Sequence, residues 1–266
     1  MRDDEDYLRE LELFDTFQQI GRVPYGATVI RSEMAPEIAV QHGRVAHTSP
    51  PLHSAKPAAA SPIKIDHARV ARIALMDWAE LQHEVGTCNA CGLCENRKQT
   101  VFGAGSQSAQ WLFVGEGPGA EEDEAGEPFV GPAGKLLDAM LAATGLKRGR
   151  GVYIANVVKC RPPGNRTPTI NEAAACAPLL DRQIDLLQPA LIVALGKTAV
   201  MRLGGAETSM ASFRGKLHNY RDIPMVATYH PAYLLRSLTE KLKGWEDMLF
   251  AKREMAKIKA SKVENG

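Results

Sequence analysis

The sequence has no long apolar run, and its N-terminus is not a basic stretch followed by an apolar one. The first absence argues against a membrane span and the second against a secretory signal, so we expect a cytoplasmic protein without membrane contact. Cysteine is also scarce, with five in 266 residues. In a cytoplasmic protein such cysteines are expected to be metal ligands or buried core residues rather than a disulfide framework.

A strong excess of charge of either sign is missing as well, because the formal net charge is only +1. The charge is nevertheless unevenly distributed. Residues 1–86 carry nine Lys and Arg against thirteen Asp and Glu, whereas residues 87–266 carry 23 against 18. A mildly basic C-terminal part is compatible with a polyanionic partner without requiring one.

Composition divides the chain into three parts. Residues 1–31 form an acidic segment, and over the first 22 residues its apolar side chains recur at helical spacing, which predicts a short amphipathic helix. Its function is not identifiable, and we favour a helix that packs on its own domain or frays in solvent over one that binds a partner. Residues 32–66 are rich in Ala, Pro and Ser and predict a linker. Residues 67–266 predict a folded domain, since an apolar content of 45% is enough for a substantial core.

Short apolar runs alternate with helical patterns in this domain. The runs predict strands over 111–116, 152–158, 191–196 and 225–230, and their nearly continuous apolar character is typical of strands buried on both faces. Helices are predicted from residue 70 past Leu81, over 133–144, 170–187 and 197–203, and from about 241 to 259. Alternation of this kind indicates an α/β fold with a parallel sheet covered on both sides. The four strand ends, at Glu116, Asn156, Gly196 and His230, are then expected to line one crevice.

A glycine-rich stretch follows the first of these strands. Three glycines stand between residues 115 and 119, and acidic side chains follow directly. Glycine lets the backbone come close to a bound group, but the turn alone favours a tight strand-to-helix connection with a solvated acidic face.

The cysteines fall into a cluster and two single residues. Cys88, Cys91 and Cys94 are three residues apart, and Cys160 and Cys176 lie around the exit of the second strand. Two clustered and two distant thiolates can enclose a tetrahedral zinc or an iron–sulfur cluster. The presence of only one close pair favours iron–sulfur, and by spacing Cys94 could replace Cys91.

Several motifs together resemble the family 4 uracil-DNA glycosylases. The matching blocks are TCNAC (87–91), GEGPG (115–119), PFVG (128–131), NVVKCRPP (156–163), NR (165–166) and YHPAYLLR (229–236). They occur in the family's order from about Thr87 to Arg236, whereas residues 1–80 lie outside the resemblance.

This resemblance implies a three-layer α/β/α sandwich on a four-stranded parallel sheet. It also implies a structural 4Fe-4S cluster with Cys88, Cys91, Cys160 and Cys176 as its ligands, because Cys94 falls where the family pattern asks for no cysteine. The implied activity is hydrolysis of the bond between uracil and deoxyribose in DNA, which leaves an abasic site and initiates base excision repair. The implied partner is uracil-containing DNA, single- or double-stranded, and we expect a monomer whose action is nucleoid-associated.

The resemblance also assigns roles in binding uracil. His230 becomes the donor to the anion that develops on the leaving base, and Phe129 stacks on that base. Asn156 matches the O4 and N3–H edge of uracil, since a carboxamide presents a donor and an acceptor together. Glu116 and Gly117 line the base, and Glu122 faces its C5 edge, where it excludes the methyl group of thymine.

The water-activating group is not settled by the motifs. Other uracil glycosylases carry an aspartate at the place of Gly117, so here Glu116 and Glu122 are expected only to position water. A largely dissociative path stabilised by electrostatics fits the missing aspartate better.

Contacts with DNA are implied for four residues. Leu234 belongs to a segment that resembles the loop pushed into the duplex, and Arg236 can hold a phosphate. Asn165 and Arg166 are the other two. A related subgroup bonds covalently to DNA through a histidine after the second strand, but residues 161–167 contain none, which predicts release and turnover.

Two other classes of function compete with this one. A non-catalytic DNA-binding protein would be favoured by loss of His230 or Asn156, and both are present. An iron–sulfur redox protein would have no use for the residues of a uracil pocket.

Deletion of residues 1–66 should leave uracil excision intact, because every block of the resemblance lies beyond them. Excision by the full chain and by the truncated chain, measured on one oligonucleotide containing deoxyuridine, checks this. Loss of excision in a truncated chain that still folds would refute an accessory role for these residues.

Overall fold

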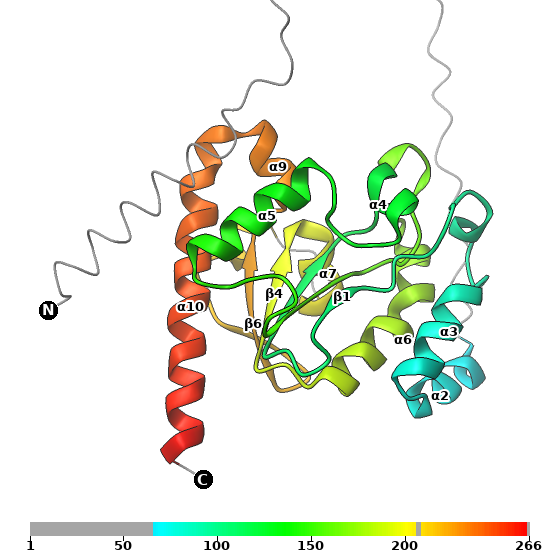
Figure 1. The fold of residues 1–266 in the computed structure, drawn as a ribbon, viewed down its shortest axis with the longest axis horizontal. Helices are drawn as coiled ribbons and strands as arrows, with labels where there is room; N and C mark the ends of the chain where they lie inside the picture. Colours follow the sequence, from blue (N-terminus) through cyan, green and yellow to red (C-terminus); the bar gives the residue numbers. More distant parts are fainter. Residues whose placement is uncertain (1–65, 206–208, 265–266) are drawn as a thin grey trace, which may run out of the picture.

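The computed structural model describes residues 66–205 and 209–264 (Figure 1). The acidic segment 1–31 and the linker 32–66, except for Asp66, lie outside the described residues. Among the described helices, none is long and apolar enough to cross a membrane.

A six-stranded mixed sheet forms the centre of the fold, with the order β1-β3-β2-β4-β6-β5. The four inner strands are parallel to one another, and the two outer strands pair antiparallel with their neighbours. The strands are β1 (Ala104–Gly105), β2 (Trp111–Gly115), β3 (Val152–Asn156), β4 (Leu191–Leu195), β5 (His218–Tyr220) and β6 (Ile223–Thr228).

The predicted four-stranded parallel sheet is therefore the inner part of a larger one. Its two outer strands contain only two and three residues, too few to show an alternating apolar pattern. The inner strands agree with their predicted positions to within about two residues, and β2, β3 and β4 are buried at every position.

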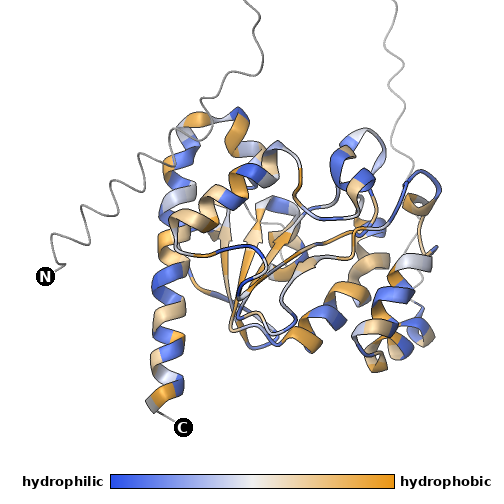
Figure 2. Ribbon diagram, viewed as in Figure 1, coloured by the Kyte–Doolittle hydropathy of each residue, from blue (hydrophilic) through white to orange (hydrophobic). Residues whose placement is uncertain are grey.

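Helices cover both faces of the sheet, which gives the expected three layers (Figure 1). One face packs against α3, α6 and α7 and the other against α5 and α10. Figure 2 shows apolar strands between helices that each carry an apolar and a polar side. The helices are α2 (His67–Leu75), α3 (Trp78–Thr87), α4 (Ala120–Ala125), α5 (Pro132–Ala143), α6 (Ile170–Leu187), α7 (Gly196–Gly204), α8 (Met210–Phe213), α9 (Pro231–Arg236) and α10 (Lys241–Glu264), with short 3-10 turns η1 (Gly92–Glu95), η2 (Pro163–Asn165) and η3 (Leu238–Glu240).

The single helix predicted from residue 70 past Leu81 is wrong, because two helices occupy this stretch. The chain is extended at Met76 and Asp77, and the Asp77 side chain caps α3 by accepting from the backbone N–H of Glu80. An aspartate that satisfies the free N–H groups of a new helix favours a start at that point over continuation of the old helix. The expected acidic loop after Gly119 likewise contains the short helix α4.

Candidate functional site

A cavity of about 430 Å³ opens beyond the carboxyl ends of the inner strands. In the sheet register Gly115 of β2 pairs with Asn156 of β3, and Leu195 of β4 pairs with Thr228 of β6, so these strands end at one level. We call this space the strand-end cavity. It is lined by Glu116, Gly117, Pro118, Gly119, Glu122, Phe129, Ala133, Asn156, Pro162, Asn165, Arg166, Thr167, His230, Ala232, Tyr233 and Arg236.

Two glycines make room for the side chains of this cavity. A Cβ atom at Gly115 would overlap the Oδ1 atom of Asn156 and lie 2.6 Å from the ring of Phe129. A Cβ atom at Gly196, where φ is +84°, would lie 2.8 Å from the Cβ atom of His230. The glycines therefore let three predicted site residues converge. Gly196 itself packs beside His230 and does not line the cavity.

His230 is held in one orientation by the start of α9. It is the N-cap of that helix, and its Nδ1 atom accepts a hydrogen bond of 3.2 Å from the backbone N–H of Ala232. An accepting Nδ1 places the proton of the neutral imidazole on Nε2. Nε2 is buried and has no hydrogen-bond partner among the described residues. The ring therefore offers one N–H donor that is not used by the protein.

Burial also decides the charge of His230. Burial, helped by the positive charge of Arg236 and opposed by Glu122, lowers the pKa of the imidazole from 6.5 to about 4. At neutral pH the side chain is thus an uncharged donor.

Asn156 ends β3 and is 2% exposed. Its Oδ1 atom is buried without a hydrogen-bond partner in the described part of the chain. Leaving a buried acceptor unpaired costs free energy, on the order of 1–3 kcal/mol, unless a ligand provides the missing donor. Asn156 and His230 together present an acceptor and a donor to the same cavity.

Phe129 forms an aromatic side of the cavity. Its ring is buried, and its centroid lies 5.4 Å from that of His230 at an angle of 30°. Its φ is +57°, which is uncommon for a large side chain. A Cβ atom at Gly134 in α5 would overlap the carbonyl oxygen of Phe129, so the backbone of α5 packs tightly behind it.

The two glutamates of the site have different environments. Glu122 accepts hydrogen bonds of 3.0 Å through both oxygens, from the backbone N–H groups of Gly119, Val130 and Gly131. Its carboxylate therefore joins α4 to the PFVG segment. Glu116 accepts a hydrogen bond from the hydroxyl of Thr198 through Oε2 alone.

Leu234 does not reach the surface, so the expectation that it contacts DNA is not met by this structure. It is 0% exposed and belongs to the core between the sheet and α10. A Cβ atom at Gly244 of α10 would lie 2.8 Å from it. Instead, helix α9 presents Tyr233, which is 37% exposed and lines the cavity.

The rim of the cavity carries polar and cationic groups. Arg236 is exposed, and no carboxylate pairs with it within the described residues. Arg166 forms a two-point ion pair with Glu172, with N–O distances of 2.7 and 2.8 Å, which fixes the guanidinium beside η2. Asn165 accepts from the Nε atom of Arg161 at 2.7 Å.

All five cysteines line a second cavity, which we call the cysteine cavity. Its other lining residues are Ala90, Leu93, Arg97, Val158, Lys159, Ala175 and Leu179. Cys94 therefore lies beside the four predicted ligands. Among the described residues, no group of three or more His, Cys, Asp or Glu side chains is placed to hold a single metal ion.

Several N–H groups point at the sulfur atoms of this cavity. Arg97 donates to the Sγ atom of Cys160 at 3.0 Å, and the backbone N–H of Lys159 donates to Cys176 at 3.3 Å. Burial raises the pKa of the Cys176 thiol to about 12, against the charge of Lys159. The N–H donors stabilise negative charge on sulfur, whereas burial keeps the free Cys176 thiol protonated, so a thiolate is expected here where a metal takes the place of the proton.

Lys159 connects the two cavities. It is 1% exposed, and its Nζ atom donates to the backbone oxygen of Asn156 at 3.0 Å and to Oε1 of Gln183 at 2.5 Å. No carboxylate of the described chain forms an ion pair with it. Burial lowers the pKa of this ammonium group to about 8, against the opposing charges of Cys176 and Cys160.

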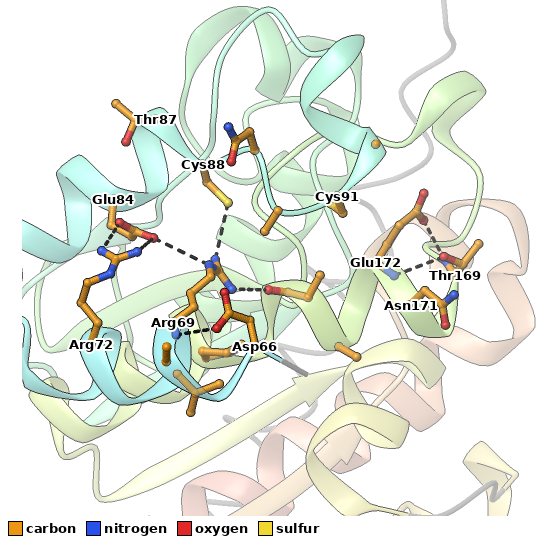
Figure 3. A pocket seen from close by; sticks show the side chains of 18 residues that line it. Asp66, Arg69, Arg72, Glu84, Thr87, Cys88, Cys91, Thr169, Asn171 and Glu172 are labelled. Atoms are coloured by element: carbon orange, nitrogen blue, oxygen red, sulfur yellow. Dashed lines mark hydrogen bonds and ion pairs between the residues drawn. The ribbon is translucent and has the colours of Figure 1, made fainter. Parts of the chain in front are cut away.

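A larger groove of about 1010 Å³ lies outside the cysteine cavity, between α2, α3 and the start of α6 (Figure 3). Cys88 and Cys91 line it. Figure 3 shows Arg69 directed towards the Sγ atom of Cys88, which it approaches to 3.5 Å, and Arg72 paired with Glu84. The groove leaves this side of the cysteine site close to the surface.

Thr198, the N–H donors to sulfur and Arg148, which bonds the backbone of the PFVG segment, were not predicted from the sequence. Tyr233 was predicted only as a member of the segment expected to enter the duplex. Arg148 stands in a turn between α5 and β3 with no motif around it. Only proximity in the fold identifies it.

Comparison with known proteins identifies relatives of this chain. Residues 102–250 match the model of the uracil DNA glycosylase superfamily. A type-4 uracil-DNA glycosylase of Thermotoga maritima is 46% identical over 168 residues, which is 61% of this chain and 85% of that protein. One from Pyrobaculum aerophilum is 43% identical over 169 residues, or 60% of this chain and 86% of that protein. A type-5 uracil-DNA glycosylase of the latter organism is 33% identical over 148 residues, or 49% and 64%.

The imidazole of His230 should titrate at about pH 4 in the folded protein, because burial and Arg236 disfavour its cationic form. Since the unfolded chain then binds the proton more readily, His230 should lower stability progressively as the pH falls from 6.5 towards 4. NMR titration of the imidazole resonances, assigned by their absence in His230→Gln, checks this. A transition at pH 6.5 would contradict it.

Proposed function

This chain belongs to the type-4 uracil-DNA glycosylases of the uracil DNA glycosylase superfamily, and we propose that its strand-end cavity receives a uracil turned out of DNA. The protein is a DNA glycosylase, a hydrolase that removes uracil from DNA in DNA repair.

The observation that carries the assignment is the pair of unpartnered polar atoms in the cavity, Nε2 of His230 and Oδ1 of Asn156. Uracil presents a carbonyl oxygen, which can accept from Nε2–H, and an N3–H group, which can donate to Oδ1. Cytosine has no N–H at that ring position, so it would leave the asparagine oxygen unpaired. The pair therefore supports both binding and discrimination.

Phe129 supplies the stacking surface for the extruded base. The ring lines the cavity, and its centroid lies 5.4 Å from that of His230, so a base that reaches the His230 donor also meets the ring. Stacking of a base on an aromatic ring contributes about 1–3 kcal/mol.

Hydrolysis breaks the bond between N1 of uracil and C1′ of deoxyribose. The bonding electrons go to the base, water adds its oxygen to C1′, and the proton that this water loses passes to the solvent. An uncharged Nε2–H donor beside the uracil carbonyl stabilises the resulting anion without first having to lose a proton. Preorganisation by the N-cap contact with Ala232 keeps the donor in place.

Glu116 is the candidate for positioning the water. Only one of its oxygens accepts from Thr198, which leaves the other for water, and the residue lines the cavity. Both oxygens of Glu122 already accept backbone N–H groups. We therefore assign Glu122 to shaping the wall at the C5 edge of uracil rather than to handling water. Gly117 contributes its backbone there, since a Cβ atom would lie 2.7 Å from Val158.

The rim residues account for contacts with the DNA backbone, single- or double-stranded. Arg236 is exposed and can contact a phosphate. Asn165, at the end of η2, and Arg166, which follows it, are the other candidates for contacts with the DNA backbone. Tyr233 replaces Leu234 as the candidate to fill the space that the base leaves, because Tyr233 is the exposed one of the two.

The cysteine cavity suits a 4Fe-4S cluster held by Cys88, Cys91, Cys160 and Cys176. The buried ammonium of Lys159, which no described carboxylate neutralises, requires nearby negative charge, and cluster-bound thiolates provide it. The N–H donors from Arg97 and Lys159 are typical of the surroundings of metal-bound sulfur. Bound there, a cluster would fix the loops that lead to Asn156.

Residues 67–266 form the catalytic domain, and residues 1–66 are an appendage whose partner is unknown. The protein acts as a monomer in the cytoplasm, at the nucleoid, where its substrate lies.

An oligonucleotide with one deoxyuridine, treated with the protein and then with alkali, should be cut at that site. His230→Ala should lower kcat by roughly 10²- to 10³-fold, the usual cost of removing a donor to a developing anion. The exposed His83 on α3 gives the matched control, His83→Ala, which should retain full activity. Activity in a folded His230→Ala protein equal to that of the control would rule out the proposed donor.

Substitution of single cysteines should distinguish a cluster ligand from Cys94, which only lies beside the proposed ligands. Purified Cys176→Ala should lose the brown colour and the absorbance at about 400 nm of a 4Fe-4S cluster, whereas Cys94→Ala should keep both. Iron and sulfide content per chain provides a second measure. Loss of the cluster in Cys94→Ala with retention in Cys176→Ala would exchange their roles.

A further inference from the structure

The PFVG segment, residues 128–131, is held by polar groups from two sides. Arg148 donates from Nη1 to the carbonyl oxygen of Pro128 at 2.7 Å and from Nη2 to that of Phe129 at 2.8 Å. On the other side Glu122 accepts from the backbone N–H groups of Val130 and Gly131. Four consecutive residues thus have a backbone group fixed by a charged side chain.

Phe129 needs such support because its backbone is strained. Its φ of +57° lies in the left-handed region, which aromatic residues rarely adopt. The carbonyl oxygen of Phe129 is also the atom that approaches α5 so closely that Gly134 has no room for a side chain. Rotation of this peptide towards a relaxed conformation would move the aromatic ring with it.

Arg148 is itself held in place. Its Nε atom donates to Oδ1 of Asp138 in α5 at 3.0 Å, so each nitrogen of the guanidinium has a partner in the protein. The side chain is 24% exposed and does not line the strand-end cavity. A planar fork that spans two adjacent carbonyl groups fixes their relative orientation, which a single donor cannot do.

We propose that Arg148 is a positioning residue that holds Phe129 in its left-handed conformation and so sets the plane on which the extruded uracil stacks. This inference rests on the proposed stacking role of Phe129. Arg148 acts only through Phe129 and touches neither the base nor the reacting atoms. Its removal should weaken binding of the base in the ground state and in the transition state alike, which raises KM and leaves kcat almost unchanged.

A double-mutant cycle tests this on a single-stranded oligonucleotide with one deoxyuridine, which avoids the cost of opening a duplex. The variants are Arg148→Met, which approximates the aliphatic part of the side chain and removes its donors, Phe129→Ala, and the two combined. Arg150→Met is the matched control, since Arg150 is exposed in the same turn.

Phe129→Ala should raise KM about tenfold or more, in line with the loss of one base–aromatic stack. Arg148→Met should raise KM about fivefold and leave kcat within about twofold of wild type, because it removes only part of the stacking free energy. Combined with Phe129→Ala, it should add nothing further, because its effect passes through that ring. Arg150→Met should match wild type.

Two results would overturn the role of Arg148. One is an unchanged KM in Arg148→Met, and the other is a full additional effect of Arg148→Met in the Phe129→Ala background, as expected if the guanidinium contacted a phosphate. A wild-type KM in Phe129→Ala would instead remove the stacking role on which the inference rests. Circular dichroism verifies folding, and if Arg148→Met fails to fold, Arg148→Gln, which keeps one donor, takes its place with the same expected pattern and smaller size.

Discussion

The four inner parallel strands end at the same level of the sheet, and both cavities depend on this register. The register pairs Gly115 with Asn156 and Leu195 with Thr228, so the connections that leave β2, β3, β4 and β6 emerge side by side. Residues far apart in sequence, such as Glu116, Asn156 and His230, therefore surround one space. The close approach of these connections requires glycine at positions 115 and 196, where a Cβ atom would displace Asn156, Phe129 or His230.

Charged side chains hold the irregular connections in place where the sheet no longer does. Glu122 binds three backbone N–H groups, and Arg148 binds two carbonyl oxygens on the same loop. Arg166 and Glu172 form a similar clamp at the start of α6. Such contacts fix loops that carry too little apolar surface to pack by themselves, and they explain how a site made of loops can be preorganised.

The buried Lys159 gives the cysteine cavity a physical connection with the site of uracil binding. Its ammonium group faces the backbone oxygen of Asn156, while its own backbone N–H donates to Cys176. In our proposal the negative charge of a cluster stabilises this lysine, and the lysine in turn supports the end of β3. A structural cluster can thus affect the recognition of uracil without taking part in the reaction.

The sequence by itself determined the alternation of strands and helices, and through the motifs the family, because buried strands and helix periodicity are local patterns. It predicted the inner strands to within about two residues and α6 at its observed bounds, Ile170–Leu187. It did not predict the outer strands, which are too short to show a pattern, or the break at Asp77, where a side-chain cap outweighs helical periodicity. Only the tertiary structure decided that Leu234 is buried while Tyr233 faces the cavity, that both oxygens of Glu122 are used by the backbone, and that Arg148 supports Phe129. These are contacts between segments distant along the chain, and the packing of α5, α9 and α10 around the strand ends sets them, so no local pattern encodes them.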